Sequence, residues 1–204
     1  MDTSTAKASR GRPKTLNRDH VVDVAMHAYW KEGLDVMSLN EICRRCEISK
    51  PGLYREFGNE DGLMQAVILA YQERVLARVL EILSTEASFR ATLDNLVSFV
   101  TTVNDNQKAP RGCLLVKMRE SRMRVGNATR EQIDAVHKES LQAYKKWVEQ
   151  AKKKGEFTAN MSSQFASTYI DAQLSHALSQ IARGEDSQVV KRILEVAFSM
   201  LDQA

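Results

Sequence analysis

The sequence contains little that interrupts a helix and no long apolar segment. Only three prolines and nine glycines are spread over 204 residues, so long helices are possible. No apolar run approaches the roughly 18 residues of a membrane span, and the polar N-terminus lacks the apolar segment of a secretory signal. Three cysteines are too few for a disulfide framework. We therefore expect a cytoplasmic protein that neither contacts a membrane nor depends on disulfides.

What remains is the composition of an ordinary globular protein with a basic N-terminus. Hydrophobic residues make up 43% of the chain and charged residues 27%, and the net charge is only +3. The first 18 residues, however, hold five basic side chains against one acidic side chain. Such an arm can place arginine in a minor groove of DNA, although many basic tails are merely solvated. We expect residues 1–16 to be a basic arm that contacts DNA through Arg10, Arg12 and Lys14.

Apolar residues recur with helical spacing along the whole chain, and no segment shows convincing strand alternation. This pattern predicts an all-α fold of about nine helices. The expected helices are Arg18–Lys31, Leu39–Arg45, Lys50–Glu56, Asn59–Leu83, Phe89–Asp105, Cys113–Arg124, Arg130–Lys153, Ser163–Ala182 and Gln188–Leu201.

The segment 38–57 carries the most specific pattern in the sequence. Ser38 and Glu41 have the spacing of a capping box, which starts one short helix, and Ser49 is placed to cap a second. Leu53 and Phe57 give the second helix an apolar side. Two such short helices need the preceding helix to form a core. Together the three predict a helix-turn-helix unit, whose second helix enters the major groove of DNA.

These residues resemble the TetR family of bacterial transcriptional regulators. The resemblance rests on Gly33 after the first helix, the Ser38 cap followed by Glu41-Ile42, the run Ile48-Ser49-Lys50, Leu53-Tyr54 with Phe57, and Leu63. A weaker likeness is the turn Gly112-Cys113-Leu114, which is found in a subgroup of the family. The resemblance implies a homodimer that binds a near-palindromic double-stranded operator. It also implies a helix-turn-helix domain at residues 17–62 and an effector-binding and dimerisation domain at 63–204.

The expected DNA contacts follow from the motif and from residue chemistry. The resemblance matches Ser38 and Tyr54 to positions that hold phosphates, and Lys50 and Gly52 to the start of the recognition helix. Lys50 and Arg55 suit contacts to phosphates or bases. Tyr54 is expected on the surface, and a packed core position is its alternative. The full expected set is Arg10, Arg12, Lys14, Ser38, Arg45, Ser49, Lys50, Gly52, Tyr54 and Arg55.

Three acidic residues depart from the family pattern. Glu47 stands in the turn where glycine is frequent, so we expect a strained turn or a turn of another type. Glu56 and Glu60 stand where an aromatic or histidine and a lysine are frequent. Acids there remove expected phosphate contacts, so we expect greater dependence of DNA affinity on the arm.

The cysteines divide into two groups. Cys43 and Cys46 have a redox-like spacing but no partner pair for zinc, so we expect both in the helix-turn-helix core. Cys113 is predicted at a helix start near Arg111 and Lys117, a position that favours the thiolate. The alternative for Cys113 is a buried residue in the wall of a pocket. No metal, cofactor or catalytic residue is predicted.

The C-terminal domain is expected to enclose an effector and to form the dimer. Polar and aromatic residues at helical spacing are candidates for the pocket, although such residues also build ordinary cores. The pocket candidates are Phe99, Cys113, Met118, Tyr144, Trp147, Tyr169 and His176. The last two helices carry wide apolar faces, which predict half of a four-helix seam or, alternatively, closure of the core within one chain. The dimer candidates are Leu174, Leu178, Ile193, Ala197, Met200 and Leu201.

The sequence thus predicts a ligand-responsive repressor that is released from a palindromic operator by a small molecule or a reactive electrophile. A helical adaptor that binds another protein through its C-terminal face is one alternative. An enzyme with a helical pocket is another, although no nucleophile–base pair, metal set or phosphate loop supports it.

Overall fold

The computed structural model describes residues 16–102 and 110–201, and all regular structure in them is helical. The helices are α1 (Arg18–Glu32), α2 (Leu39–Arg45), α3 (Lys50–Phe57), α4 (Glu60–Tyr71), α5 (Ala77–Leu83), α6 (Phe89–Thr101), α7 (Leu114–Glu120), α8 (Asn127–Lys153), α9 (Ser163–Arg183) and α10 (Ser187–Phe198). A π-helical segment, Gln72–Leu76, joins α4 and α5 into one helix, so these residues form nine helices. The predicted all-α fold is confirmed. None of the described helices is long and apolar enough to cross a membrane.

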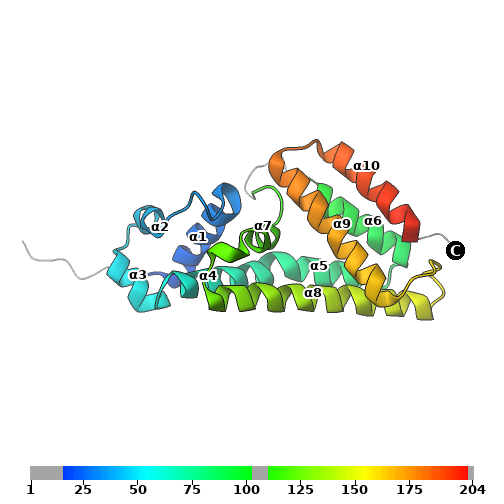
Figure 1. Ribbon diagram of the computed structural model, residues 1–204, viewed down its shortest axis with the longest axis horizontal. Coiled ribbons are helices and arrows are strands. Elements are labelled where there is room, and N and C mark those ends of the chain that lie inside the picture. The colour runs from blue at the N-terminus through cyan, green and yellow to red at the C-terminus, as the bar shows by residue number, and fades with distance from the viewer. Residues whose placement is uncertain (1–15, 103–109, 202–204) are drawn as a thin grey trace, which may run out of the picture.

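The first three helices form a small unit at one end of the elongated molecule (Figure 1). Each begins at a capping side chain, because Asn17, Ser38 and Ser49 accept hydrogen bonds from the backbone N–H three residues later. The caps at Ser38 and Ser49 are those that the sequence predicts. The turn between α2 and α3 is closed by Glu47, whose φ is +53°. Its neighbour Ile48 donates a backbone hydrogen bond to the Cys43 carbonyl, as in a Schellman motif.

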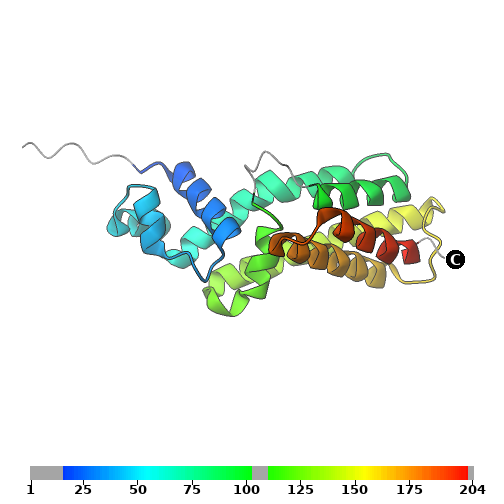
Figure 2. The same ribbon diagram turned by 90° about the horizontal axis from the view of Figure 1, so that it is seen from above.

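Two long helices run along the length of the molecule and connect its two ends. In Figures 1 and 2, α8 lies beside the continuous helix formed by α4, the π-helical segment and α5, and its later turns pack against α9. Helices α6, α9 and α10 form the opposite end of the molecule, and α7 lies between the two ends (Figure 1). The structure therefore places α7 where the first three helices meet the rest of the chain.

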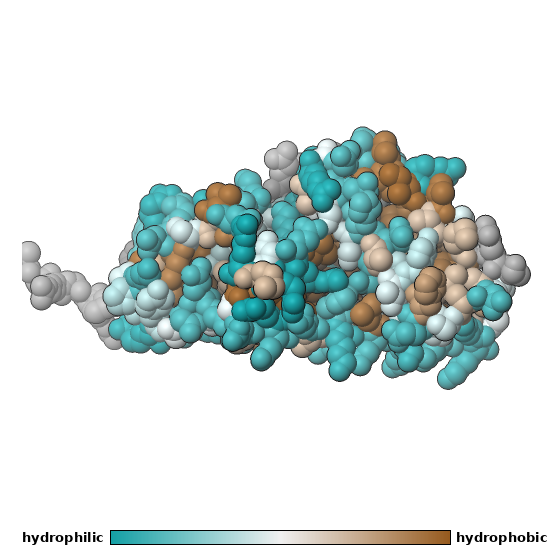
Figure 3. Space-filling model, viewed as in Figure 1, coloured by the Kyte–Doolittle hydropathy of each residue, from teal (hydrophilic) through white to brown (hydrophobic). Residues whose placement is uncertain are grey.

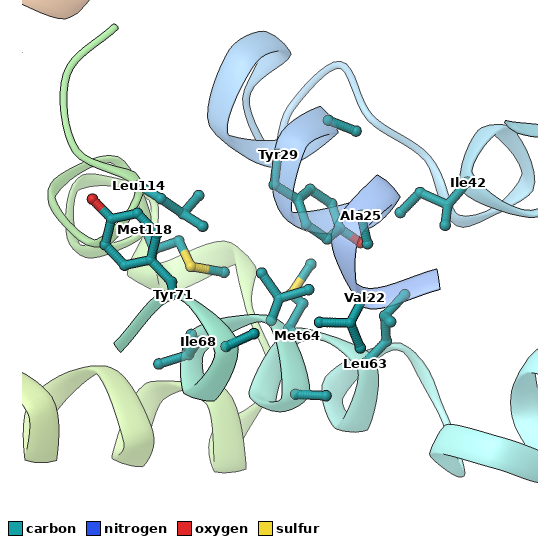
Figure 4. Packing of buried hydrophobic residues seen from close by; sticks show 14 of the residues in the cluster. Val22, Ala25, Tyr29, Ile42, Leu63, Met64, Ile68, Tyr71, Leu114 and Met118 are labelled. Atoms are coloured by element: carbon teal, nitrogen blue, oxygen red, sulfur yellow. The ribbon is translucent and has the colours of Figure 1, made fainter. Parts of the chain in front are cut away.

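The buried residues form two separate apolar clusters. The N-terminal core combines residues of 21–71 with residues of 113–136, including Leu114, Met118 and Ile133. Figure 4 shows its centre, where Tyr29 and Ile42 from the first helices face Leu63, Ile68 and Tyr71 from α4. The C-terminal core combines residues of 83–97 with residues of 144–201. The helix-turn-helix unit thus shares its core with α4, α7 and the start of α8.

Several predicted helix ends differ from the structure. The segment predicted as one helix, Cys113–Arg124, is α7 followed by a separate 3₁₀ turn, Arg122–Arg124. Helix α8 begins at Asn127, three residues before the predicted start, because a side chain from α4 caps it. Helix α6 ends at Thr101. Residues 103–105 of the predicted helix lie outside the described residues, and so do residues 1–15.

Candidate nucleic-acid interface and ligand cavity

The exposed side of α3 presents a tyrosine between two cations. Leu53 and Phe57 are buried beneath the helix, whereas Lys50, Tyr54 and Arg55 face solvent. Tyr54 is 40% exposed, so it is a surface residue and not part of the core. The Lys50 Nζ atom lies 5.7 Å from the centroid of the Tyr54 ring. A phosphate placed at this edge can receive hydrogen bonds from the ammonium group and the phenol hydroxyl.

Hydroxyl groups and a glycine complete this side of the unit. The Ser38 and Ser49 side chains accept hydrogen bonds from the backbone N–H groups of Glu41 and Gly52. Each hydroxyl hydrogen is left to donate to an outside acceptor, because a serine Oγ can accept and donate at once. Gly52 lies in the first turn of α3, where an added Cβ would stand 3.1 Å from the capping Ser49 Oγ atom.

Arg45, which was predicted to contact DNA, is held by two carboxylates in this structure. Its guanidinium donates to Glu41 Oε1 at 2.8 Å and to Glu32 Oε2 at 3.0 Å. The hydrogen bonds from Arg44 and Arg45 lower the pKa of Glu41 to about 2, and the hydrogen bond from Arg45 lowers the pKa of Glu32. Arg45 must therefore exchange these partners before it can bind a phosphate.

Glu56 is also paired within the unit. The Arg18 Nε atom lies 3.5 Å from Glu56 Oε1, and the Arg18 guanidinium lies over the ring of Phe57. The pair reduces the repulsion that an isolated carboxylate beside DNA would produce. Glu60 is exposed in the first turn of α4. The predicted arm contacts, Arg10, Arg12 and Lys14, lie outside the described residues.

A cavity of about 550 Å³ lies among α1, the helix of α4 and α5, and helices α6 to α9. Its size is typical of small-molecule sites. Its walls include the predicted residues Phe99, Cys113 and Tyr144. Apolar side chains such as Trp30, Val79, Leu96 and Leu174 make up much of the remaining lining.

The other four predicted pocket residues lie elsewhere, for reasons that the packing makes plain. Met118 is fully buried in the N-terminal core, and Trp147 stacks on Phe89 in the C-terminal core with ring centroids 4.4 Å apart. The Tyr169 hydroxyl donates to the Ala197 carbonyl at 2.8 Å, which ties α9 to α10. His176 lines a separate, polar hollow beside α7 and α8.

Cys113 lies at the start of α7 as predicted, but its surroundings do not favour a thiolate. It is buried, and its Sγ atom accepts a hydrogen bond from the Tyr71 hydroxyl at 3.2 Å. Burial raises the pKa of the Cys113 thiol above its ordinary value, more than this hydrogen bond lowers it. The structure therefore resembles the alternative of a buried wall residue.

The sequence did not reveal a polar cluster in the wall of the cavity. His137 Nε2 lies 2.9 Å from Asp171 Oδ2, and Arg119 Nη1 lies 3.6 Å from the same oxygen. The sequence offered no acid partner for His137, because Asp171 lies 34 residues away on α9. Only the packing of α8 against α9 brings the two side chains together.

Direct hydrogen bonds connect the helix-turn-helix unit to the walls of the cavity. The Trp30 indole at the end of α1 donates to the Gly112 carbonyl at 3.1 Å, and the Lys117 ammonium of α7 donates to the Trp30 carbonyl. Asp61, in the first turn of α4, accepts hydrogen bonds from the backbone N–H groups of Ala128 and Thr129 and thereby caps α8. These hydrogen bonds join α7 to α1, and α8 to α4.

Helix α10 exposes an apolar stripe on the side away from the C-terminal core. Val189, Ile193, Val196 and Met200 are 42–57% exposed, and their spacing places them on one face. We call these four residues the α10 face. Figure 3 shows hydrophobic atoms gathered at the upper right, where Figure 1 places α10.

Four of the six predicted dimer residues lie outside the α10 face. Leu174 and Leu201 are buried in the C-terminal core of the single chain, so in this conformation they close that core. Leu178 lines the cavity, and Ala197 is half-buried. Ile193 and Met200 remain exposed.

Comparisons with known proteins agree with this geometry. The sequence profile described as "Bacterial regulatory proteins, tetR family" matches residues 21–67, which include α2, α3 and much of α1 and α4. The HTH-type transcriptional repressor ComR of Escherichia coli K12 is 31% identical over 115 residues, which cover 56% of this chain and 55% of ComR. The regulator UidR of the same strain is 36% identical over 81 residues, covering 40% of this chain and 38% of UidR. These matches span about half of the relatives' length or less.

Solved structures share the fold over nearly the whole chain. A cysteine mutant of the TetR-family regulator CifR, complexed with 26-bp double-strand operator DNA, matches with a TM-score of 0.80 and 22% identity over 94% of this chain and all of that one. Reduced NemR of E. coli matches with a TM-score of 0.77 and 17% identity over 90% of this chain and 96% of that one.

The match to the TetR family profile covers the helix-turn-helix segment, residues 21–67, and the likeness to the solved structures shows that the fold is shared. The two relatives named above are a transcriptional repressor and a transcriptional regulator.

Proposed function

We propose that this protein is a DNA-binding transcriptional repressor, released from its operator by a small molecule that enters the cavity. The observation that carries the proposal is the exposed edge of α3, where Lys50, Tyr54 and Arg55 project from a capped helix within the family-matched segment. The N-terminal turn of such a helix is the part that contacts base edges in helix-turn-helix proteins.

The relatives support the DNA partner and the repressor role. CifR, which shares the fold, was solved with double-strand operator DNA, and ComR is named as a repressor. Recognition of a palindromic operator requires two helix-turn-helix units related by two-fold symmetry. We propose that the α10 face pairs with its copy in a second chain to form this homodimer in the cytoplasm.

The connections around α7 supply a route for the response. A ligand in the cavity contacts α7, α8 and the π-helical segment, while Trp30 and Asp61 attach α1 and α4 to the same elements. The ligand shifts the protein toward release only to the extent that it binds the released conformation more tightly. We propose that this preference arises from the altered position of α1 and α4 relative to α7.

Substitutions on α3 test the DNA-binding role. The operator is first obtained by sequencing genomic fragments that the purified protein retains. Lys50→Ala and Tyr54→Phe are then compared with wild type by fluorescence anisotropy at fixed salt. We expect Tyr54→Phe to weaken binding by about 1–3 kcal/mol, because it removes a hydrogen bond to a charged phosphate.

The control is Lys146→Ala, which removes an exposed lysine of α8 outside the proposed interface. We expect wild-type affinity for this variant. Unchanged operator affinity in both α3 variants would show that this edge does not carry binding. Deletion of residues 1–14 in the same assay tests the arm: a contact to phosphates predicts a flatter dependence of log affinity on log salt.

A further inference from the structure

The lining of the cavity is strongly cationic. His27 and Lys31 project from α1 with a spacing of four residues, and Arg74 and Arg78 do the same on the neighbouring helix. Arg111 adds a further charge from the segment before α7. Arg119 and His137 also line the cavity, and Asp171 is the single acidic residue among the described residues of the lining.

Some of these cationic side chains have a carboxylate partner, and others have none among the described residues. Arg74 pairs with Asp23, and Arg119 lies 3.6 Å from Asp171. Arg78 and Arg111, in contrast, make no ion pair or hydrogen bond within residues 16–102 and 110–201.

Lys31 also lacks an ion pair in these ranges, because the adjacent Glu32 is already bonded to Arg45. All three uncompensated side chains are exposed, so they surround the entrance of the cavity. Cations of one sign around a cleft with apolar walls concentrate anions there.

A tyrosine supplies a hydroxyl to the same lining. Tyr144 lines the cavity from α8, and its hydroxyl makes no hydrogen bond to any residue that the structure describes. Burial raises the pKa of Tyr144, so the phenol remains protonated. Its hydroxyl is therefore available to donate to a polar atom of a ligand.

Apolar side chains make up much of the remaining lining. Val79, Leu96, Val100 and Leu174 are among them. A volume of about 550 Å³ greatly exceeds the roughly 30 Å³ of a water molecule, so a simple inorganic anion would leave most of it unfilled. The lining therefore matches a molecule with a charged end, an apolar body and a second polar group.

We propose that the ligand of this cavity is an organic anion of that kind, with a carboxylate, sulfonate or phosphate at the entrance. Arg78, Arg111 and Lys31 receive the oxyanion, the apolar walls hold the body, and the Tyr144 hydroxyl donates to the second polar group. The inference names the effector class for the proposed regulator and rests on that proposal for its biological meaning. Because Lys31 belongs to α1 and Arg78 to α5, the bound oxyanion attaches the helix-turn-helix unit to the opposite wall.

The test compares two fluorescent probes that share one apolar body. These are 1-anilinonaphthalene-8-sulfonate and N-phenyl-1-naphthylamine, which lacks the sulfonate. The chain has two tryptophans, of which Trp30 lines the cavity and Trp147 lies in the C-terminal core. In a Trp147→Phe background, energy transfer from Trp30 therefore reports probe bound in the cavity. We expect the sulfonate to bind about tenfold tighter, as for one hydrogen-bonded charge of about 1.5 kcal/mol.

Matched variants separate binding of the sulfonate by the cavity cations from non-specific binding of the probes to the protein surface. The double variant Arg78→Gln/Arg111→Gln is expected to lose the tenfold preference by weakening the sulfonate while leaving the neutral probe unchanged. The control is Lys146→Gln/Lys153→Gln, which removes two exposed charges of α8 outside the cavity and should keep the preference.

Equal affinity for both probes, or an unchanged preference in the arginine variant, overturns the proposal. Absence of energy transfer with either probe overturns it as well. These readouts involve no DNA, whereas the operator measurements on the Lys50 and Tyr54 variants involve no probe. Failure of the anion site is therefore distinguishable from failure of the proposed DNA-binding function.

Discussion

Glu47 carries a backbone conformation that glycine adopts at lower cost. With φ at +53° it closes the Schellman turn between α2 and α3. A side chain with a Cβ costs about 1 kcal/mol in this region. We expect Glu47→Gly to be more stable than Glu47→Ala by about 1 kcal/mol in urea denaturation. The alanine variant is the reference because both substitutions remove the same carboxylate. Equal stability of the two would indicate that the turn is not strained.

Cys113 provides a prediction of pH dependence. Its raised pKa means that the neutral thiol dominates at pH 7, and the reactive thiolate increases until the pH passes that raised value. We expect alkylation of Cys113 in the native protein to accelerate about tenfold per pH unit from 7 to 9, without levelling off.

Mass spectrometry of limited iodoacetamide labelling follows Cys113 separately from Cys43 and Cys46, whose pKa values burial also raises. A rate that is already at its plateau at pH 7 would restore the interpretation of Cys113 as a reactive sensor. Tyr71→Phe is the companion variant, because it removes the hydrogen bond to the sulfur without opening the wall.

At the level of helices, Asp61 is the clearest connection between the two ends of the molecule. Its carboxylate accepts from the Ala128 and Thr129 N–H groups and from the Thr129 hydroxyl, so the first turn of α8 is capped by α4. We expect Asp61→Ala to lower the free energy of unfolding by about 1–3 kcal/mol, because a partly buried helix end loses its acceptors.

Asp61→Asn keeps one carbonyl acceptor and should cost less than the alanine variant in the same thermal or urea denaturation. Thr129→Val removes only the hydroxyl donor and tests that bond alone. If Asp61→Ala unfolds like wild type, the cap does not stabilise the junction, and the proposed route from α8 to α4 loses its support.

The helices that the sequence predicted well are those with local signals. Asn17, Ser38 and Ser49 cap helices through atoms only a few residues away, so their roles were visible in the sequence. The start of α8 was not, because its cap is 67 residues distant on α4. The π-helical segment was missed as well, since such single-turn segments are rare and this one has no side-chain cap to mark it.

The residues of the cavity were also hard to predict, because contacts between distant segments decide which side chains line it. Trp147 and Tyr169 had the composition of pocket residues, but partners from distant segments decided otherwise: Phe89 stacks on the first, and the Ala197 carbonyl accepts from the second. The cationic lining was invisible in the sequence, because Lys31, Arg78, Arg111 and Arg119 converge only when α1, α5 and α7 pack. The residue type of each candidate indicated its polarity, but only the packing of the helices determined whether its side chain lines the cavity.

For the whole molecule, the α10 face predicts the assembly state. Four exposed apolar side chains in one stripe match a surface that a second copy buries. We expect Ile193→Glu/Val196→Glu to sediment as a monomer and to lose most of its operator affinity, because a single helix-turn-helix unit reads half of a palindrome.

Met123→Glu is the matched control, since Met123 is 76% exposed but lies in the 3₁₀ turn after α7. It should sediment like wild type. A dimeric Ile193→Glu/Val196→Glu variant would place the interface elsewhere and would leave the α10 face for a different partner.

The composition of the N-terminal core has a consequence for how the chain is made. That core needs Leu114, Met118, Ile133 and Val136 in addition to the first 71 residues. On a translating ribosome the helix-turn-helix unit is therefore synthesised long before the side chains that complete its core. Until α7 and the start of α8 have emerged, Tyr71 has Trp30 as a partner but lacks the apolar side chains of α7 and α8. A nascent chain thus completes the core of its helix-turn-helix unit only together with a wall of the cavity.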